Sequence, residues 1–125
     1  MRVVEDEIVA DTPTTAKQWR AVHRYARISP RKARLVIDLI RDQPVNAARD
    51  ILRFTRKRGS RLIEKVLASA MAKANEQEAD VRSLYVAEAR VDAAPFIRRW
   101  RPKDRGRAHQ ILKRTSHIVV AVQER

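Results

Sequence analysis

The pattern of apolar and polar residues divides the chain into strands near both ends and helices between them. Residues 19–26, 84–91 and 118–122 alternate along the chain, as strands do when successive side chains point to opposite faces. In the first stretch, the odd-numbered residues from Trp19 to Tyr25 share one face, and the basic residues lie on the other. The three stretches predict a small antiparallel sheet.

Helical periodicity predicts three helices between the first and second strands. Ser29-Pro30 is typical of a helix start, because a serine oxygen caps free amides and proline suits the first helical position, so a helix is expected over residues 30–41. Pro44 begins a second helix, and Thr55 is the predicted cap of a third that ends at the polar run 75–80. The predicted buried stripes are Leu35, Val36, Leu39 and Ile40; Val45, Ala48, Ile51 and Leu52; and Leu62, Ile63, Val66, Leu67, Ala70, Met71 and Ala74. Phe54 closes the second helical segment. The predicted fold class is α+β, with three helices packed on a small three-stranded antiparallel sheet.

A strongly basic segment, residues 96–107, lies between the second and third strands. The turn signal Pro102-Lys103-Asp104-Arg105-Gly106 predicts an antiparallel hairpin. With strands that leave the body near Arg90 and Lys113, about ten residues at about 3.3 Å each give an arm on the order of 30 Å. A ribbon of that length is marginal alone in water, so this long protruding β-hairpin arm, about residues 90–113, is expected to be mobile when free and rigid when bound. We call six of its residues the arm cations: Arg98, Arg99, Arg101, Lys103, Arg105 and Arg107.

Charge indicates the kind of partner. The 28 Lys and Arg against 15 Asp and Glu give a formal charge of +13, which opposes compaction unless a polyanion neutralises it. Residues 1–17, with two cations against four carboxylates and no apolar periodicity, predict a flexible acidic tail before a single domain over residues 18–125. Phosphates match the excess charge, and Phe96 and Trp100 among the arm cations offer rings that stack on exposed bases. RNA is the expected partner; a membrane, an acidic protein or an ordinary solvated hairpin are the alternatives.

The residues present do not support a catalytic function. The chain has no cysteine and only two glycines, which excludes a disulfide framework, a thiolate metal site and a glycine-rich phosphate loop. His23, His109 and His117 lack the spacing of metal ligands, and Ser116 beside His117 points to the opposite face of a strand. We expect no catalytic residue, metal, cofactor or small-molecule substrate. Because no apolar run approaches the roughly 18 to 20 residues of a membrane span, a cytosolic location is the default expectation.

Three motifs carry a resemblance to a known family. They are Ile28-Ser29-Pro30-Arg31-Lys32-Ala33-Arg34-Leu35-Val36, Arg105-Gly106-Arg107-Ala108 and Ile111-Leu112-Lys113-Arg114-Thr115-Ser116-His117-Ile118. Over residues 19–122 the chain resembles the family of bacterial large-subunit ribosomal protein twenty-two. The resemblance implies ribosomal RNA binding by Tyr25, Arg27, Ser29, Lys32, Arg34, Arg98, Arg99, Trp100, Arg101, Lys103, Arg105, Gly106, Arg107, His109, Lys113, Arg114, Thr115, Ser116 and His117. It also implies that the hairpin tip, Ile97, Arg98, Arg99, Trp100, Arg101, Pro102 and Lys103, lines the nascent-peptide exit tunnel.

The function that the resemblance implies is structural. A body on the outside of the large ribosomal subunit, in the cytoplasm, knits domains of large-subunit ribosomal RNA together. Neighbouring ribosomal proteins and the nascent polypeptide are further expected partners, and no membrane or obligate homo-oligomer is expected. The chain departs from the family where Asp92-Ala93-Ala94-Pro95 replaces the usual Asp-Glu-Gly-Pro and where Asp104 enters a neutral or basic stretch. A duplex-DNA architectural protein and an RNA-processing enzyme are the two alternative classes.

Overall fold

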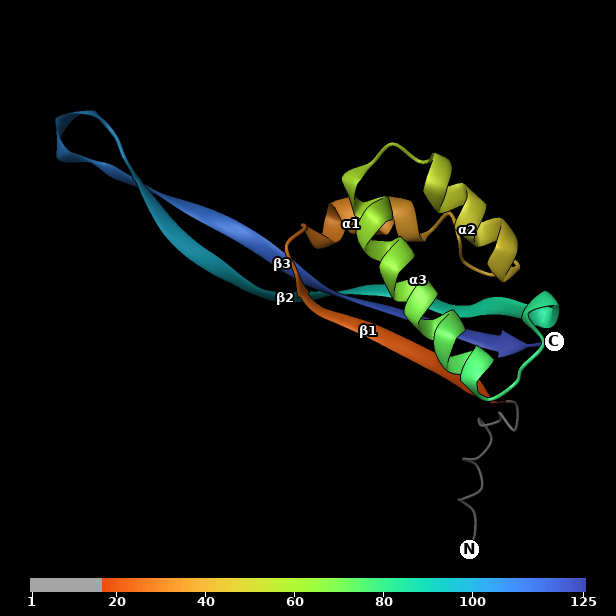
Figure 1. Ribbon diagram of the computed structural model, residues 1–125. Coiled ribbons are helices and arrows are strands. Elements are labelled where there is room, and N and C mark those ends of the chain that lie inside the picture. Colours follow the sequence, from red (N-terminus) through yellow and green to blue (C-terminus); the bar gives the residue numbers. More distant parts are fainter. Residues whose placement is uncertain (1–16) are drawn as a thin grey trace, which may run out of the picture.

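The framework of the molecule is a three-stranded antiparallel sheet with the strand order β1-β3-β2 (Figure 1). The computed structural model describes residues 17–125, so the predicted tail lies outside the described residues except for Lys17. Strand β1 is Gln18–Ala26, β2 is Leu84–Pro102 and β3 is Ala108–Glu124. Strand β3 lies in the centre and pairs with both β1 and β2, which confirms the predicted three-stranded antiparallel sheet.

The arm is the part of the β2–β3 ribbon that extends beyond β1 (Figure 1). Strand β1 ends where Ala26 pairs with Ser116, whereas β2 and β3 remain paired from Ala94 and Thr115 out to Pro102 and Ala108. Eight residues at about 3.3 Å each correspond to an unsupported ribbon of about 26 Å. The predicted protruding hairpin is therefore confirmed.

Three helices cover one face of the sheet (Figure 1). Helix α1 is Pro30–Ile37, α2 is Val45–Phe54 and α3 is Arg58–Glu76. Helix α3 packs on β1 and β3, α1 packs on β2, and α2 packs on α3. A short 3-10 helix, η2 (Val81–Ser83), leads from α3 into β2. The α+β arrangement matches the predicted fold class.

Charged side chains cover the opposite face of the sheet. Arg20 on β1 and Glu88 on β2 both pair with Ala121 on the central strand, and the small alanine lets their side chains meet above it at 3.1 Å. Arg90 extends the cluster, with ion pairs to Glu88 and, at 3.2 Å, to Asp92. The carboxylates of Glu88 and Asp92 are thus paired with arginines of the body.

The face assignment predicted for Tyr25 is wrong. The pairing of β1 with β3 shifts between His23 and Ala26, and Tyr25 takes a φ of 57°. This bulge turns the Tyr25 side chain outward, where it is 60% exposed, and places Ala26 in the core instead. The backbone N–H of Tyr25 donates to Nδ1 of His117 at 3.1 Å, and the two rings meet edge to face at 4.9 Å.

Helix α1 is shorter than predicted, and its buried stripe differs. The helix ends at Ile37 instead of residue 41, because tighter turns follow and Asp42 takes a φ of 65°. Leu35 and Leu39 are exposed, by 59% and 48%. The apolar residues of this segment fit two overlapping stripes, and packing selected the one that faces the core: Ala33, Val36, Ile37 and Ile40.

The other two helices follow their predicted stripes closely. All residues of the α3 stripe are buried or packed against the core, as are Val45, Ala48, Ile51 and Leu52 of α2. Phe54 is the last residue of α2, as predicted, and its side chain is 85% exposed. The predicted cap was wrong: Lys57, not Thr55, precedes α3, and the Thr55 hydroxyl donates to the carbonyl of Ile51 at 2.6 Å at the end of α2.

Candidate nucleic-acid interface

The root of the arm is held by a hydrogen bond at a strand irregularity. The pairing of β2 with β3 shifts between Ala94 and Ile97, next to the unusual Asp92-Ala93-Ala94-Pro95 segment. The hydroxyl of Thr115 donates to the carbonyl of Pro95 at 2.6 Å, and Thr115 is only 3% exposed. Thr115 therefore stabilises the place where the arm leaves the body.

Burial removes two predicted RNA-binding side chains from the surface. Thr115 and Ser116 are both buried, so their hydroxyls are not available to a large ligand at the protein surface. The pairing of these residues with the small Ala94 and Ala93 on β2 explains how they fit inside. Of the two, Thr115 supports the root of the arm through its hydrogen bond to Pro95.

The arm exposes cations on both of its faces. Alternation along the paired strands places Arg98, Trp100 and Leu112 on one face and Arg99, Arg101 and His109 on the other. Trp100 is 65% exposed, and all residues from 98 to 110 are exposed. Within residues 17–125, no arm cation takes part in an ion pair. The arm therefore presents unneutralised charge beside exposed apolar surface.

The tip is a tight turn built on left-handed backbone. A short 3-10 turn, η3 (Asp104–Gly106), contains Arg105 at a φ of 58° and Gly106 at 73°. The N–H of Lys103 donates to the carbonyl of Arg107 at 2.7 Å, which closes the hairpin as the turn signal predicted. Glycine accepts a positive φ without steric cost, whereas Arg105 does so against its preference. In the described part of the chain, the Asp104 carboxylate forms no ion pair with Arg105 or Arg107.

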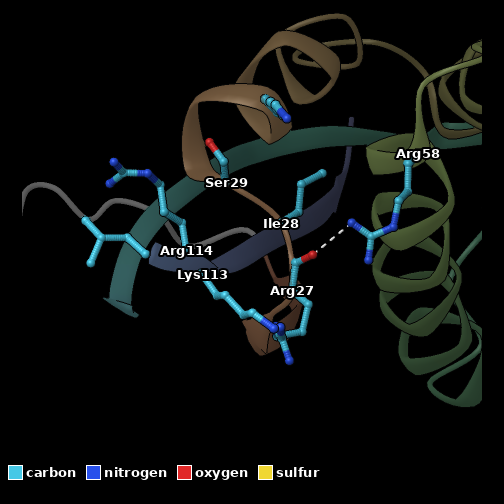
Figure 2. A pocket seen from close by; sticks show the side chains of 8 residues that line it. Arg27, Ile28, Ser29, Arg58, Lys113 and Arg114 are labelled. Carbon is cyan, nitrogen blue, oxygen red and sulfur yellow. Dashed lines mark hydrogen bonds between the residues drawn. The ribbon is translucent and has the colours of Figure 1, made fainter. Parts of the chain in front are cut away.

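A second concentration of positive charge lies where the arm meets the body (Figure 2). A hollow of about 430 Å³ opens there between the β1–α1 connection, the start of α3 and the outer part of β3. We call it the basic cleft, and its lining residues are Arg27, Ile28, Ser29, Lys32, Arg58, Leu112, Lys113 and Arg114. No carboxylate lines it, so its field attracts anions.

The side chains of the basic cleft are held in part by the backbone (Figure 2). Nη1 of Arg58 donates to the carbonyl of Arg27 at 2.8 Å, which fixes the guanidinium at the mouth of the hollow. Lys113 extends toward Arg27, while Arg114 extends in the opposite direction, as successive residues of a strand do. Arg114 lies over the Phe96 ring, with its guanidinium carbon 5.7 Å from the ring centre. Ser29 makes no capping hydrogen bond, contrary to prediction, so its hydroxyl is available in the cleft.

The cleft unites some of the residues predicted from sequence and adds others. One hollow is lined by Arg27, Ser29, Lys32, Lys113 and Arg114, although the first and the last are 87 positions apart in the sequence. The predicted RNA-binding residues did not include Ile28, Arg58 and Leu112. The basic run Arg56-Lys57-Arg58 at the start of the third helix was the available signal for Arg58.

Arg34, Tyr25 and His117 lie outside the basic cleft and contact the body. Nε and Nη2 of Arg34 donate to the carbonyl of Val91 at 3.1 and 3.0 Å. Arg41 contacts the carbonyl of Ala89 in the same way, at 3.2 and 2.7 Å, so the two guanidinium groups cover part of the outer edge of β2. Arg34 therefore anchors α1 to the base of the arm.

The histidines and hydroxyls of the described residues do not form a catalytic or metal centre. His117 uses Nδ1 to accept a hydrogen bond from the Tyr25 backbone, and the buried Ser116 hydroxyl has no hydrogen-bond partner among residues 17–125. No group of three or more potential metal ligands gathers within this range. None of the described helices has the length and apolarity needed to cross a membrane.

Comparison with known proteins gives one consistent family. A family model described as ribosomal protein L22p/L17e matches residues 21–123. The large ribosomal subunit protein uL22 of Caldicellulosiruptor saccharolyticus is 50% identical over 120 residues, which cover 95% of this chain and 98% of that protein. The protein of the same name from Rubrobacter xylanophilus is 55% identical over 102 residues, 81% of this chain and 80% of that protein. These similarities include the body and the arm.

Proposed function

Because the chain belongs to the ribosomal protein L22p/L17e family, we propose that its arm and its basic cleft bind large-subunit ribosomal RNA. Membership of this family makes the protein a structural component of the large ribosomal subunit, a cytoplasmic particle, and not an enzyme. Within that particle its partners are ribosomal RNA and other ribosomal proteins.

The unneutralised charge of the arm and cleft is the observation that carries the proposal. The ion pairs within residues 17–125 involve cations of the body, such as Arg20 and Arg90, and leave the arm cations unpaired. Guanidinium groups bind phosphate oxygens bidentately, and exposed Trp100 adds a ring on which an unstacked base can lie. A cationic groove and arm of this kind bind folded RNA better than a neutral surface would.

The arm joins separate RNA elements in this proposal. Its ribbon extends about 26 Å beyond the last pair of β1, so its tip and the basic cleft contact RNA segments that lie far apart. Cations on both faces support burial of the arm between RNA strands, because a one-sided surface interaction needs only one charged face. The two-stranded ribbon becomes rigid when phosphates neutralise both faces.

The hairpin tip, residues 97–103, lines the nascent-peptide exit tunnel in this proposal. Family membership is its main support, and the exposed Trp100 and the narrow turn η3 are compatible with a wall element that contacts a passing polypeptide. Because the turn is closed by the bond between Lys103 and Arg107, the tip keeps a defined shape.

Co-sedimentation with ribosomal subunits tests the proposal. The tagged chain is expected to sediment with the large subunit, and hydroxyl-radical footprinting from a probe attached near Lys113 is expected to cleave large-subunit RNA close to the basic cleft. A variant in which Asn-Gly replaces residues 95–114 keeps the body but lacks the arm and the part of the cleft formed by residues 112–114, and it is expected to dissociate from the large subunit at a lower salt concentration than the full chain. Absence of the chain from the large-subunit fraction contradicts the proposal, and preferential binding to duplex DNA over ribosomal RNA supports the architectural alternative.

A further inference from the structure

A second hollow adjoins the basic cleft and has different chemistry. We call it the apolar slot; it holds about 400 Å³ and is lined by Ile28, Lys32, Leu35, Lys57, Arg58 and Gly59. Three residues, Ile28, Lys32 and Arg58, line both hollows. The two hollows are therefore neighbours. The basic cleft has a mainly cationic lining, whereas the apolar slot combines apolar residues with the cations Lys32, Lys57 and Arg58.

Two residues shape the walls of the apolar slot: Leu35 by its exposed side chain, and Gly59 because it has no side chain. Leu35 is 59% exposed although it is a large apolar residue, and it stands on the slot side of α1. Gly59 lies opposite, in the first turn of α3, where a Cβ atom would approach Cδ1 of Ile28 to 3.0 Å. Glycine at this position lets α3 pack closely on Ile28, so the slot has a close-packed floor.

Arg58 stands between the two hollows. Its guanidinium is oriented by the 2.8 Å hydrogen bond to the Arg27 carbonyl, and no carboxylate among residues 17–125 forms an ion pair with it. A fixed guanidinium plane stacks on a nucleobase while its remaining N–H groups reach a phosphate. The Ser29 hydroxyl in the adjoining cleft is a further donor for a phosphate or ribose oxygen.

We propose that the basic cleft and the apolar slot together hold one unstacked nucleotide of the RNA, with its phosphate in the cleft and its base in the slot. The proposal rests on the RNA-binding function proposed above and names the feature that the body recognises. A regular duplex keeps its bases stacked and presents only phosphates, so it leaves the apolar slot empty. A bulged or looped-out nucleotide supplies both the anion and the flat apolar group that the paired hollows match.

The test compares hairpin RNAs that differ at one position. One RNA carries a single bulged adenosine, the second carries an abasic residue at the bulge, and the third is a continuous duplex. Because stacking of a base on a protein surface changes affinity by about 5- to 150-fold, the full chain is expected to bind the bulged RNA more tightly than the abasic RNA by a factor in this range. Binding is measured by fluorescence anisotropy at one salt concentration.

Two exposed leucines, Leu35 on α1 and Leu39 in the turns that follow it, provide a matched pair of variants. Leu35→Asn removes the apolar wall of the slot and is expected to abolish the preference for the bulged base. Leu39→Asn changes a similarly exposed leucine one turn later, outside the slot, and is expected to keep the preference. Circular dichroism checks that both variants retain the helices.

The outcomes separate this inference from the proposed function. Equal affinity for the bulged and abasic RNAs, with salt-dependent binding retained, overturns the nucleotide site but leaves RNA binding in place. Loss of the preference in both leucine variants also overturns it, because the slot would then not be the cause. Leu35-dependent binding of a peptide of alternating Glu and Leu, at an affinity equal to that of the bulged RNA, overturns it in favour of an acidic protein ligand.

Discussion

Neutralising three arm cations is expected to weaken RNA binding through the loss of phosphate contacts. The variant carries Arg99→Gln, Arg101→Gln and Lys103→Gln, all at exposed positions near the tip and outside any ion pair of the described residues. Glutamine keeps most of the length and polarity of the side chains. The change therefore removes charge and little else.

The magnitude follows from counterion release. Each phosphate that a cation neutralises contributes about −0.7 to −0.9 to the slope of log K against log salt concentration. Loss of three such contacts makes the slope less steep by about 2 to 3, and at about 0.1 M salt it raises the Kd roughly 100- to 500-fold. The lower slope and the higher Kd must appear together, because both arise from the same released ions.

The assay titrates large-subunit ribosomal RNA with the protein over a range of KCl concentrations. A matched control carries Arg53→Gln, Arg61→Gln and Arg82→Gln, which lower the formal charge of +13 by the same three units but lie on α2, α3 and η2. The control is expected to keep most of the affinity. Equal losses in the two variants refute the reasoning, since net charge and not the arm would then determine binding.

The remaining predictions concern the body and the attachment of the arm. Replacing residues 95–114 with Asn-Gly joins the paired residues Ala94 and Thr115 by a two-residue turn, and the helical circular dichroism signal is expected to persist; an unfolded spectrum would show that the arm belongs to the core. Thr115→Val removes the hydrogen bond to Pro95, and urea denaturation is expected to give a loss of about 1 kcal/mol; an unchanged midpoint contradicts the role of Thr115 at the arm root. Leu67→Ala in the fully buried stripe of α3 is expected to cost about 2 to 5 kcal/mol of unfolding free energy, whereas the exposed Leu39→Ala control is expected to change it by less than about 1 kcal/mol; similar effects in both would contradict the assigned core.

Local pattern predicted those elements whose signals are long or chemically specific. Helix α3 has nineteen residues with one continuous apolar stripe, so no competing stripe exists. The turn from Pro102 to Gly106 carries residues suited to a tight hairpin, and the charge of the arm follows from composition. In each case the information lies within neighbouring residues, where periodicity and turn chemistry operate.

The cap positions and the short helix were harder to predict. Ser29 and Thr55 are good capping residues, yet neither hydroxyl caps a helix start, because Thr55 bonds back to Ile51 and Ser29 faces the cleft. In α1, two stripes fit the same periodicity, and the contacts of Arg34 and Arg41 with β2 accompany the stripe that is buried. Local preference was therefore overruled by packing against distant residues.

The α+β body, the basic hairpin arm and the polyanionic partner could all be inferred from the amino-acid sequence, since alternation, helical periodicity and net charge are properties of the chain alone. Tertiary contacts were needed to bring Arg27, Arg58 and Lys113 into one cleft, to place Leu35 at an adjoining slot, and to bury the Thr115 side chain against Pro95. These features depend on the pairing of β1 with β3 and on the docking of α1 and α3 against the sheet. Contacts between residues so far apart in sequence are selected by the free energy of packing the whole domain, which no local pattern records.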